Sequence, residues 1–251
     1  MIRRKTGGGW LLFAQDDHAR LSAEIMSLWG GGFFFTSPSD DLLFAISEHD
    51  CGWKEADSSP VLNPDGVPES FTEVPPQKQC DIWRRSFNAH STARPEACAL
   101  IALHFKKFND RVLSRGENKW SLALRREIDE FVARSLCVES VEDIPARVER
   151  DLRLLQTGDA LSLVLCHGWE SFEMSGVPLE NGGEETVRLT MTDENIYSAS
   201  PWPFSRGEDL SFEIGFTRVR GDKFDSNAQL LKQAEGRTGE KMVFCLSPEN
   251  A

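Results

Sequence analysis

The 251 residues include 28 Lys and Arg and 40 Asp and Glu, which gives a formal net charge of −12. A field of this sign repels phosphate backbones and anionic lipids, so we expect neither a nucleic-acid backbone nor a membrane among the partners. A small phosphorylated molecule in a locally positive pocket stays compatible with this charge. The composition, 40% hydrophobic and 27% charged, is typical of a globular protein and excludes a disordered tail or a fibre.

The N-terminal segment resembles a signal peptide only in its basic start, Arg3 to Lys5. The apolar stretch that follows, Trp10 to Ala14, is too short for a signal sequence. No apolar run approaches the ~20 residues needed to cross a bilayer. The six cysteines form no Cys-x-x-Cys pair and suit a reducing compartment. We therefore expect a cytoplasmic protein.

Hydrophobic residues recur with helical periodicity up to about residue 168, and this pattern predicts five helices. They run from about Leu11 to Trp29, from Ser39 or Asp40 onward, from Pro95 onward, from about Ser121 to Leu136, and from near Pro145 to Cys166. The segment from Gly52 to about Cys80 is rich in Pro, Gly, Asp and Ser. A structureless segment of that length is usually functional, so we expect it to cover a binding site.

After Gly168 the pattern changes to alternation of apolar and polar residues, which is typical of strands. Alternation is clearest around Val187–Met191, Leu210–Phe216 and Met242–Leu246, with a short helix over Ser226–Ala234. The sequence therefore predicts a mainly α protein. Its helical domain would occupy residues 1–168, and a small antiparallel β region over residues 169–251 would pack on it as an α+β element.

Five ionisable residues occupy positions on the apolar faces of the predicted helices: His18, His49, Asp50, His104 and Asp159. An unpaired buried carboxylate costs several kcal/mol or has its pKa forced upward, so such residues need compensating partners. Imidazole nitrogen and carboxylate oxygen are together the usual ligands of divalent metal ions. A metal site is the interpretation we favour, and a buried His–Asp hydrogen-bond network without metal is the alternative.

The order of these residues on helices resembles a known signature. His18, the adjacent pair His49-Asp50 and the distant Asp159 look like the motif of the HD superfamily of metal-dependent phosphohydrolases, and His104 falls where its dinuclear members often add a histidine. The resemblance implies an HD-like helical bundle that binds one or two divalent ions, Fe, Mn, Zn or Mg.

A closer resemblance covers most of the chain. The segments Gln15–Ala19, Glu48–Trp53, Gly66–Phe71, Gly158–Leu163 and Pro201–Phe204 are similar to an uncharacterised bacterial family, the domain of unknown function 3891. This family implies no known substrate.

In the HD superfamily, a metal-activated water attacks phosphorus. By resemblance, His18, His49, Asp50 and Asp159 would be ligands, and Asp50 would bridge two ions if two are bound. His104 would either bind a second ion or protonate the leaving oxygen. Lys54 follows the His-Asp pair and is the favoured cation for the phosphate of a small-molecule substrate.

Three functions are compatible with these residues. The first is a metal-dependent hydrolase of a phosphate ester. The second is a non-enzymatic module that binds a metal or a small ligand, and the third is a di-iron oxygenase of HD fold. His90, in a polar segment, is either a further ligand or a surface histidine. The sequence does not specify the oligomeric state.

Overall fold

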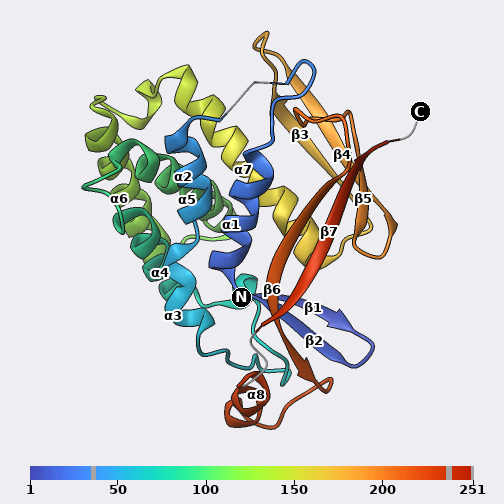
Figure 1. Ribbon diagram of the computed structural model, residues 1–251. Coiled ribbons are helices and arrows are strands. Elements are labelled where there is room, and N and C mark those ends of the chain that lie inside the picture. Colours follow the sequence, from blue (N-terminus) through green and yellow to red (C-terminus); the bar gives the residue numbers. More distant parts are fainter. Residues whose placement is uncertain (35–37, 236–238, 250–251) are drawn as a thin grey trace.

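The computed structural model describes residues 1–34, 38–235 and 239–249. Helices α1–α7 lie together on one side of a large curled sheet, whereas α8 lies apart from them at one end of the sheet (Figure 1). Helices α1 and α7 contact the strands and separate the sheet from the other long helices. Most functional residues singled out above lie in this helical layer.

The helices begin and end close to recognisable signals. Ser39 accepts a hydrogen bond from the amide of Leu42 at the start of α2, Pro95 occupies the first turn of α5, and Gly168 ends α7 in the left-handed conformation with φ of 68°. The α-helices are α1 (Gln15–Met26), α2 (Asp40–Glu48), α3 (Lys54–Asp57), α4 (Pro76–Asn88), α5 (Pro95–Arg115), α6 (Lys119–Leu136), α7 (Ala146–His167) and α8 (Asn227–Ala234), with short 3-10 turns η1 (Cys51–Trp53), η2 (Phe71–Glu73) and η3 (Val141–Asp143).

The sheet has seven strands in the order β1-β2-β6-β7-β5-β4-β3. Neighbouring strands are antiparallel except for β5 and β7, which are parallel. The strands are β1 (Ile2–Thr6), β2 (Gly9–Phe13), β3 (Ser171–Pro178), β4 (Glu184–Asp193), β5 (Ile196–Ser200), β6 (Leu210–Arg220) and β7 (Glu240–Pro248).

The expectation of a mainly α, HD-like bundle with a small antiparallel region is therefore wrong. Helices make up 48% of the structure and strands 24%, and the strands form one large mixed sheet, so the fold is α/β and not all-alpha. The error arose mainly at the N-terminus. Residues Ile2–Phe13 form a hairpin that pairs with β6, from the far end of the chain. The predicted helix from about Leu11 begins only at Gln15, and Leu11, Leu12 and Phe13 belong to β2.

The segment from Gly52 to Cys80 also contains more structure than expected. It holds η1, α3 and η2 and the first turn of α4. Helix α4 was missed because Pro75 and Pro76 look like loop residues, although Pro76 occupies the first helical turn. Its buried face, Cys80, Trp83 and Phe87, has the 3–4 spacing of a helix.

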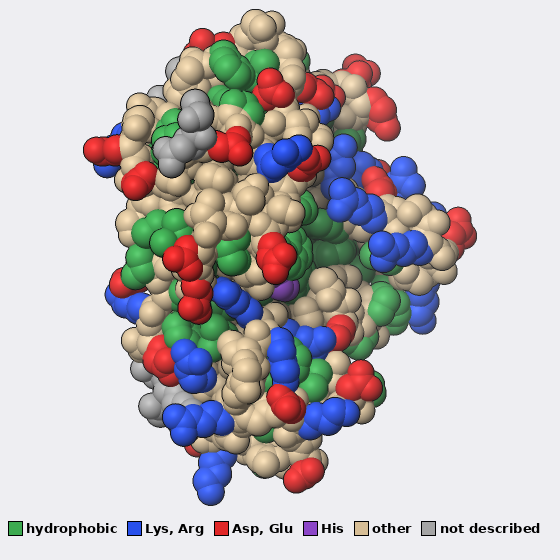
Figure 2. All heavy atoms as spheres, turned by 90° about the vertical axis from the view of Figure 1, so that its right-hand side faces the viewer, with side chains coloured by type: hydrophobic (Ala, Val, Ile, Leu, Met, Phe, Trp, Pro, Cys, Tyr) green, Lys and Arg blue, Asp and Glu red, His purple; other side chains and the backbone are tan. Residues whose placement is uncertain are grey.

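One hydrophobic cluster joins the helices to the sheet: it contains Ile25 and Leu155 as well as Leu189 and Phe244. The division into two domains at residue 168 stays a prediction. Among the residues that the structure describes, no helix has the length and hydrophobicity of a transmembrane helix. On the face shown in Figure 2, basic and acidic side chains are interspersed around a hollow that contains hydrophobic side chains.

Gly52 allows η1 to contact the backbone of α4. Its amide donates to Ser86 Oγ at 3.0 Å, and a Cβ at this position would lie 2.2 Å from the carbonyl oxygen of Ile82. We expect Gly52→Ala to lower the free energy of unfolding by about 1–3 kcal/mol, because the helix backbone must shift. Urea unfolding measures this change. The matched control is Gly215→Ala in β6, where a Cβ meets no described atom within 4 Å. Equal losses in both variants would contradict the explanation.

Candidate metal centre

Five buried ionisable side chains meet between four helices. His18 comes from α1, His49 and Asp50 from the end of α2, His104 from α5 and Asp159 from α7. None of them is more than 7% exposed. All five residues singled out from the sequence as metal ligands thus lie in one cluster, which we call the His–Asp cluster.

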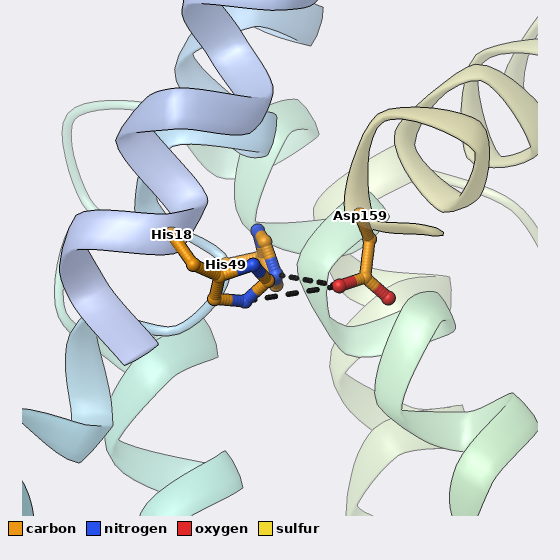
Figure 3. Close-up of side chains that lie close together, drawn as sticks. All are labelled: His18, His49 and Asp159. Carbon is orange, nitrogen blue, oxygen red and sulfur yellow. Dashed lines mark ion pairs between the residues drawn. The ribbon is translucent and has the colours of Figure 1, made fainter. Parts of the chain in front are cut away.

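The contacts within the His–Asp cluster are short. Asp159 Oδ1 lies 3.7 Å from His18 Nε2 and 3.6 Å from His49 Nε2, and its Oδ2 lies 3.6 Å from His104 Nε2. Asp50 Oδ2 lies 3.0 Å from His18 Nε2 and 3.7 Å from His49 Nε2. Figure 3 shows the imidazoles of His18 and His49 directed at the carboxylate of Asp159 from the opposite side. The two carboxylates are therefore each in reach of two or more imidazoles.

The end of α2 fixes the orientation of His49. Its Nδ1 donates to the carbonyl oxygen of Ile46 at 2.7 Å, so Nε2 faces the cluster. This Nε2 is buried and has no hydrogen-bond partner among the described residues. A ring nitrogen held by a backbone carbonyl, with the other nitrogen aimed into a cluster of ligands, is the usual arrangement of a metal-binding histidine.

Two serines fix His18 between α1 and α7. His18 Nδ1 lies 2.7 Å from Ser162 Oγ, which in turn donates to the carbonyl oxygen of Asp159 at 3.1 Å. Ser22 Oγ lies 2.6 Å from the same hydroxyl. The small side chains at positions 22 and 162 let the helices approach and orient His18 Nε2 towards Asp50 and Asp159.

The charges in the His–Asp cluster shift the pKa values of its members. Burial lowers the pKa of His49, but the carboxylates of Asp50 and Asp159 outweigh burial and raise this pKa to about 9. Burial raises the pKa of Asp159, but the contacts with His49, His104 and His18 outweigh it and lower this pKa to about 2. For His104, burial dominates and lowers the pKa to about 4. At neutral pH, the metal-free cluster therefore contains a protonated His49 and a neutral His104.

The raised pKa of His49 predicts how the metal-free chain responds to pH. The folded state keeps a proton on His49 that the unfolded state releases near pH 6.5. The protonated His49 therefore stabilises the folded state fully below about pH 6.5, and this contribution is lost as the pH rises through about 9. We expect the free energy of unfolding, measured by urea titration with a chelator present, to fall across this interval. His49→Gln should flatten the dependence. An equally steep fall in the wild type and in His49→Gln would show that other titratable groups cause the pH dependence.

The donor atoms of the His–Asp cluster fit a divalent metal ion. The ligand atoms of His18, His49 and Asp159 all lie within 4.8 Å of one another, so these three residues could hold one ion. His49 Nε2, which faces the cluster, has no hydrogen-bond partner among the described residues, so this polar group is incompletely satisfied without an ion. Nitrogen and oxygen donors suit zinc, iron or manganese better than magnesium, which prefers oxygen alone.

A cavity of about 350 Å³ opens onto the His–Asp cluster. His18, Asp50, His104 and Asp159 lie in its wall. The volume suits a small molecule. Its other walls are largely aromatic, and these side chains are Trp53, Phe71, Trp83, Phe105 and Phe108.

The segment that follows the His-Asp pair lines this cavity, as we expected. Trp53, Phe71, Thr72 and Gln79 all contribute to the wall, and the rings of Trp53 and Phe71 meet edge to face with centroids 6.4 Å apart. Trp53 is 2% exposed. The segment is therefore packed as a fixed wall beside the cluster.

Lys54 lies apart from the cavity wall. Its ammonium group is 3.1 Å from Asp16 Oδ1 and 3.9 Å from Glu48 Oε2, and it is not among the residues that line the cavity. Its role as a phosphate-binding cation stays a prediction. His90 also lies outside the His–Asp cluster, with Nε2 3.5 Å from Glu48 Oε2.

Among the described residues, two cations that the sequence did not single out line the cavity, Arg111 and Arg115. Both lie on α5, and the positions 104, 108, 111 and 115 follow helical spacing on one face. Extending the face that contains His104 by two turns would have found them. Arg111 lies over the ring of Phe108, 5.8 Å from its centroid, and makes no ion pair within the described part of the chain.

The fold and the cluster define an α/β protein with a buried His–Asp site, able to hold a metal ion, at the end of an aromatic cavity. The family of proteins of unknown function DUF3891 matches residues 1–219, and the chain belongs to this family. The searches of curated proteins and of solved structures found no significant match.

Proposed function

We propose that the chain is a metal-dependent hydrolase that cleaves a phosphate ester in the aromatic cavity. His18, His49, Asp50, His104 and Asp159 would hold one or two divalent ions. The observation that carries the proposal is the buried Nε2 of His49, which makes no hydrogen bond with the described residues and faces Asp159 Oδ1 at 3.6 Å, in a cluster that lines a cavity. The resemblance of the residue order to the HD phosphohydrolase signature supports the same conclusion.

The reaction adds water across a phosphorus–oxygen bond. A divalent ion held by these residues would lower the pKa of a water molecule and supply hydroxide near neutral pH. In the net reaction the oxygen of a water molecule would bond to phosphorus and the bond from phosphorus to the ester oxygen would break. The leaving oxygen would take up a proton, so the products would be an alcohol and a phosphate. The low pKa of His104 makes it a poor source of this proton at neutral pH and favours a role as ligand.

The substrate phosphate needs cations around its remaining oxygens. Arg111 and Arg115 supply two guanidinium groups in the cavity wall, and guanidinium binds phosphate oxygens in a bidentate manner. The apolar rings between them and the His–Asp cluster would contact the organic part of the substrate. The sequence-based choice of Lys54 is less well supported, because its contacts are with Asp16 and Glu48.

Arg111→Gln tests the role of the cavity arginines. We expect KM for a phosphate ester to rise about tenfold or more, because a charged hydrogen bond to phosphate contributes about 1.5–3 kcal/mol, while kcat changes less. Steady-state kinetics measure both constants. Arg134→Gln is the matched control: Arg134 lies over the ring of Phe131 at 6.0 Å on α6, but does not line the cavity. An unchanged KM in Arg111→Gln would remove this residue from substrate binding.

The proposed activity is tested by assaying the full chain with p-nitrophenyl phosphate and bis(p-nitrophenyl) phosphate in the presence of Mn²⁺, Zn²⁺, Fe²⁺ or Mg²⁺. We expect slow hydrolysis of one ester that depends on the added metal and stops with a chelator. A chain that binds metal but hydrolyses neither ester with any of these ions would favour the binding-module alternative.

A further inference from the structure

A second group of ligand-type side chains lies beside the His–Asp cluster. Glu48 and Cys51, which flank His49 and Asp50 in the sequence, meet His90 from the turn between α4 and α5. The carboxylate oxygen, thiol sulfur and imidazole nitrogen all lie within 4.8 Å of one another. None of the three residues belongs to the proposed hydrolytic site, and we call them the Glu–Cys–His group.

The backbone around the Glu–Cys–His group is well fixed. The carbonyl oxygen of His90 accepts hydrogen bonds from the amides of Ala93 and Arg94, at 3.1 and 2.9 Å. Cys51 lies in η1, is 8% exposed, and its sulfur has a long contact of 3.8 Å with the carbonyl oxygen of Ser86. The side chain of His90 is 42% exposed and gives the group access to solvent. A buried sulfur and a solvent-accessible imidazole converge on the same carboxylate.

We propose that Glu48, Cys51 and His90 form a second divalent metal site, which takes zinc in preference to magnesium or calcium. Thiolate, imidazole and carboxylate are the three ligand types that zinc takes in proteins, and three protein ligands leave a fourth position for water. A sulfur ligand favours zinc over magnesium or calcium. This inference goes beyond the proposed hydrolase and does not depend on it, because the two sites share no ligand.

Binding of the ion requires two changes, the loss of the Cys51 proton and the release of Glu48 from Lys54. The Cys51 thiol would lose its proton on binding the ion, so binding should be stronger at higher pH. Lys54 approaches Glu48 to 3.9 Å, but its shorter contact is with Asp16 at 3.1 Å, so it can keep that partner when Glu48 turns to the metal. A bound ion would then join the end of α2, η1 and the α4–α5 turn, and would brace the segment that carries His49 and Asp50.

Cobalt(II) reports such a site directly, because a cobalt–thiolate bond gives a sulfur-to-metal charge-transfer absorption in the near ultraviolet. We would titrate the metal-free full chain with Co²⁺ and then with Zn²⁺. The wild type should develop this absorption and lose it when zinc displaces cobalt. Cys51→Ser should lack it, and Cys137→Ser, which changes an exposed cysteine, should keep it. Asp159→Asn should also keep it, which separates this site from the hydrolytic one.

His90→Gln provides a second variant that leaves the core intact, because its side chain is partly exposed. Removing this ligand should weaken cobalt binding by more than about tenfold, since even changes beside a ligand cost about 10–100-fold. Circular dichroism checks the fold of each variant. No charge-transfer absorption in the wild type, an absorption unchanged in Cys51→Ser, or full affinity in His90→Gln would each overturn the proposal.

Discussion

Asp159→Asn is expected to abolish hydrolysis and metal binding at the His–Asp cluster. Asp159, on α7, is the carboxylate that His18, His49 and His104 all approach within 3.7 Å. The second carboxylate of the cluster, Asp50, comes from the end of α2. Asparagine keeps the shape of the side chain but removes its negative charge. Substitutions beside a metal ligand lower metal affinity or activity about 10–100-fold, and we expect loss of the ligand itself to lower both further. The measurements are kcat/KM for the phosphate ester and the metal content of the purified variant.

Asp151→Asn is the matched control for this experiment. It lies earlier on α7, where it accepts hydrogen bonds from Arg150, and it does not line the cavity. We expect its activity and metal content to match the wild type. Hydrolysis that survives Asp159→Asn with the metal still bound would contradict the proposed mechanism.

Removal of the metal should lower the melting temperature of the chain that keeps Asp50. It should leave the melting temperature of the Asp50→Ala variant unchanged. An ion that binds only the folded state stabilises it, by about 2.7 kcal/mol when its concentration is about 100 times Kd. For a chain of this size, that is about 5–10 °C in Tm. Thermal unfolding followed by circular dichroism, with and without chelator, measures the shift.

Both chains in this comparison should also contain Cys51→Ser, so that the Glu–Cys–His group does not contribute to the shift. A structural effect of Asp50→Ala lowers Tm equally with and without chelator and is thereby separated from metal binding. Equal chelator shifts in the two chains would show that Asp50 is not a ligand.

The sequence predicted the members of the His–Asp cluster because burial of charge is a strong local signal. Each of His18, His104 and Asp159 interrupts an otherwise apolar helical face, and such a residue must find a partner in the core. The helices that carry them were also predicted from periodicity, and of the two candidate caps of α2, Ser39 and Asp40, Ser39 is the cap. These features depend on neighbours three or four residues apart in the chain.

The sheet could not be predicted in the same way, because its pairings join distant segments. The N-terminal hairpin pairs Trp10 with Val219, and β5 pairs in parallel with β7. The basic run Arg3 to Lys5 hid the alternation of β1, because long basic side chains can lie along a sheet edge. Arg111 and Arg115 were missed for another reason. They are exposed residues at the end of a helix, and only the cavity distinguishes them from other surface arginines.

The most direct test of the proposed metal site is an anomalous diffraction measurement on crystals of the full chain grown with excess Mn²⁺ or Zn²⁺ near neutral pH. We expect an anomalous peak between the imidazoles of His18 and His49 and the carboxylate of Asp159, at the usual ~2 Å from each ligand atom. Crystals of Asp159→Asn grown in the same way should lack this peak. If the wild type shows no peak in the His–Asp cluster with excess metal, the cluster is a hydrogen-bond network and the chain is not a metal-dependent hydrolase of this kind.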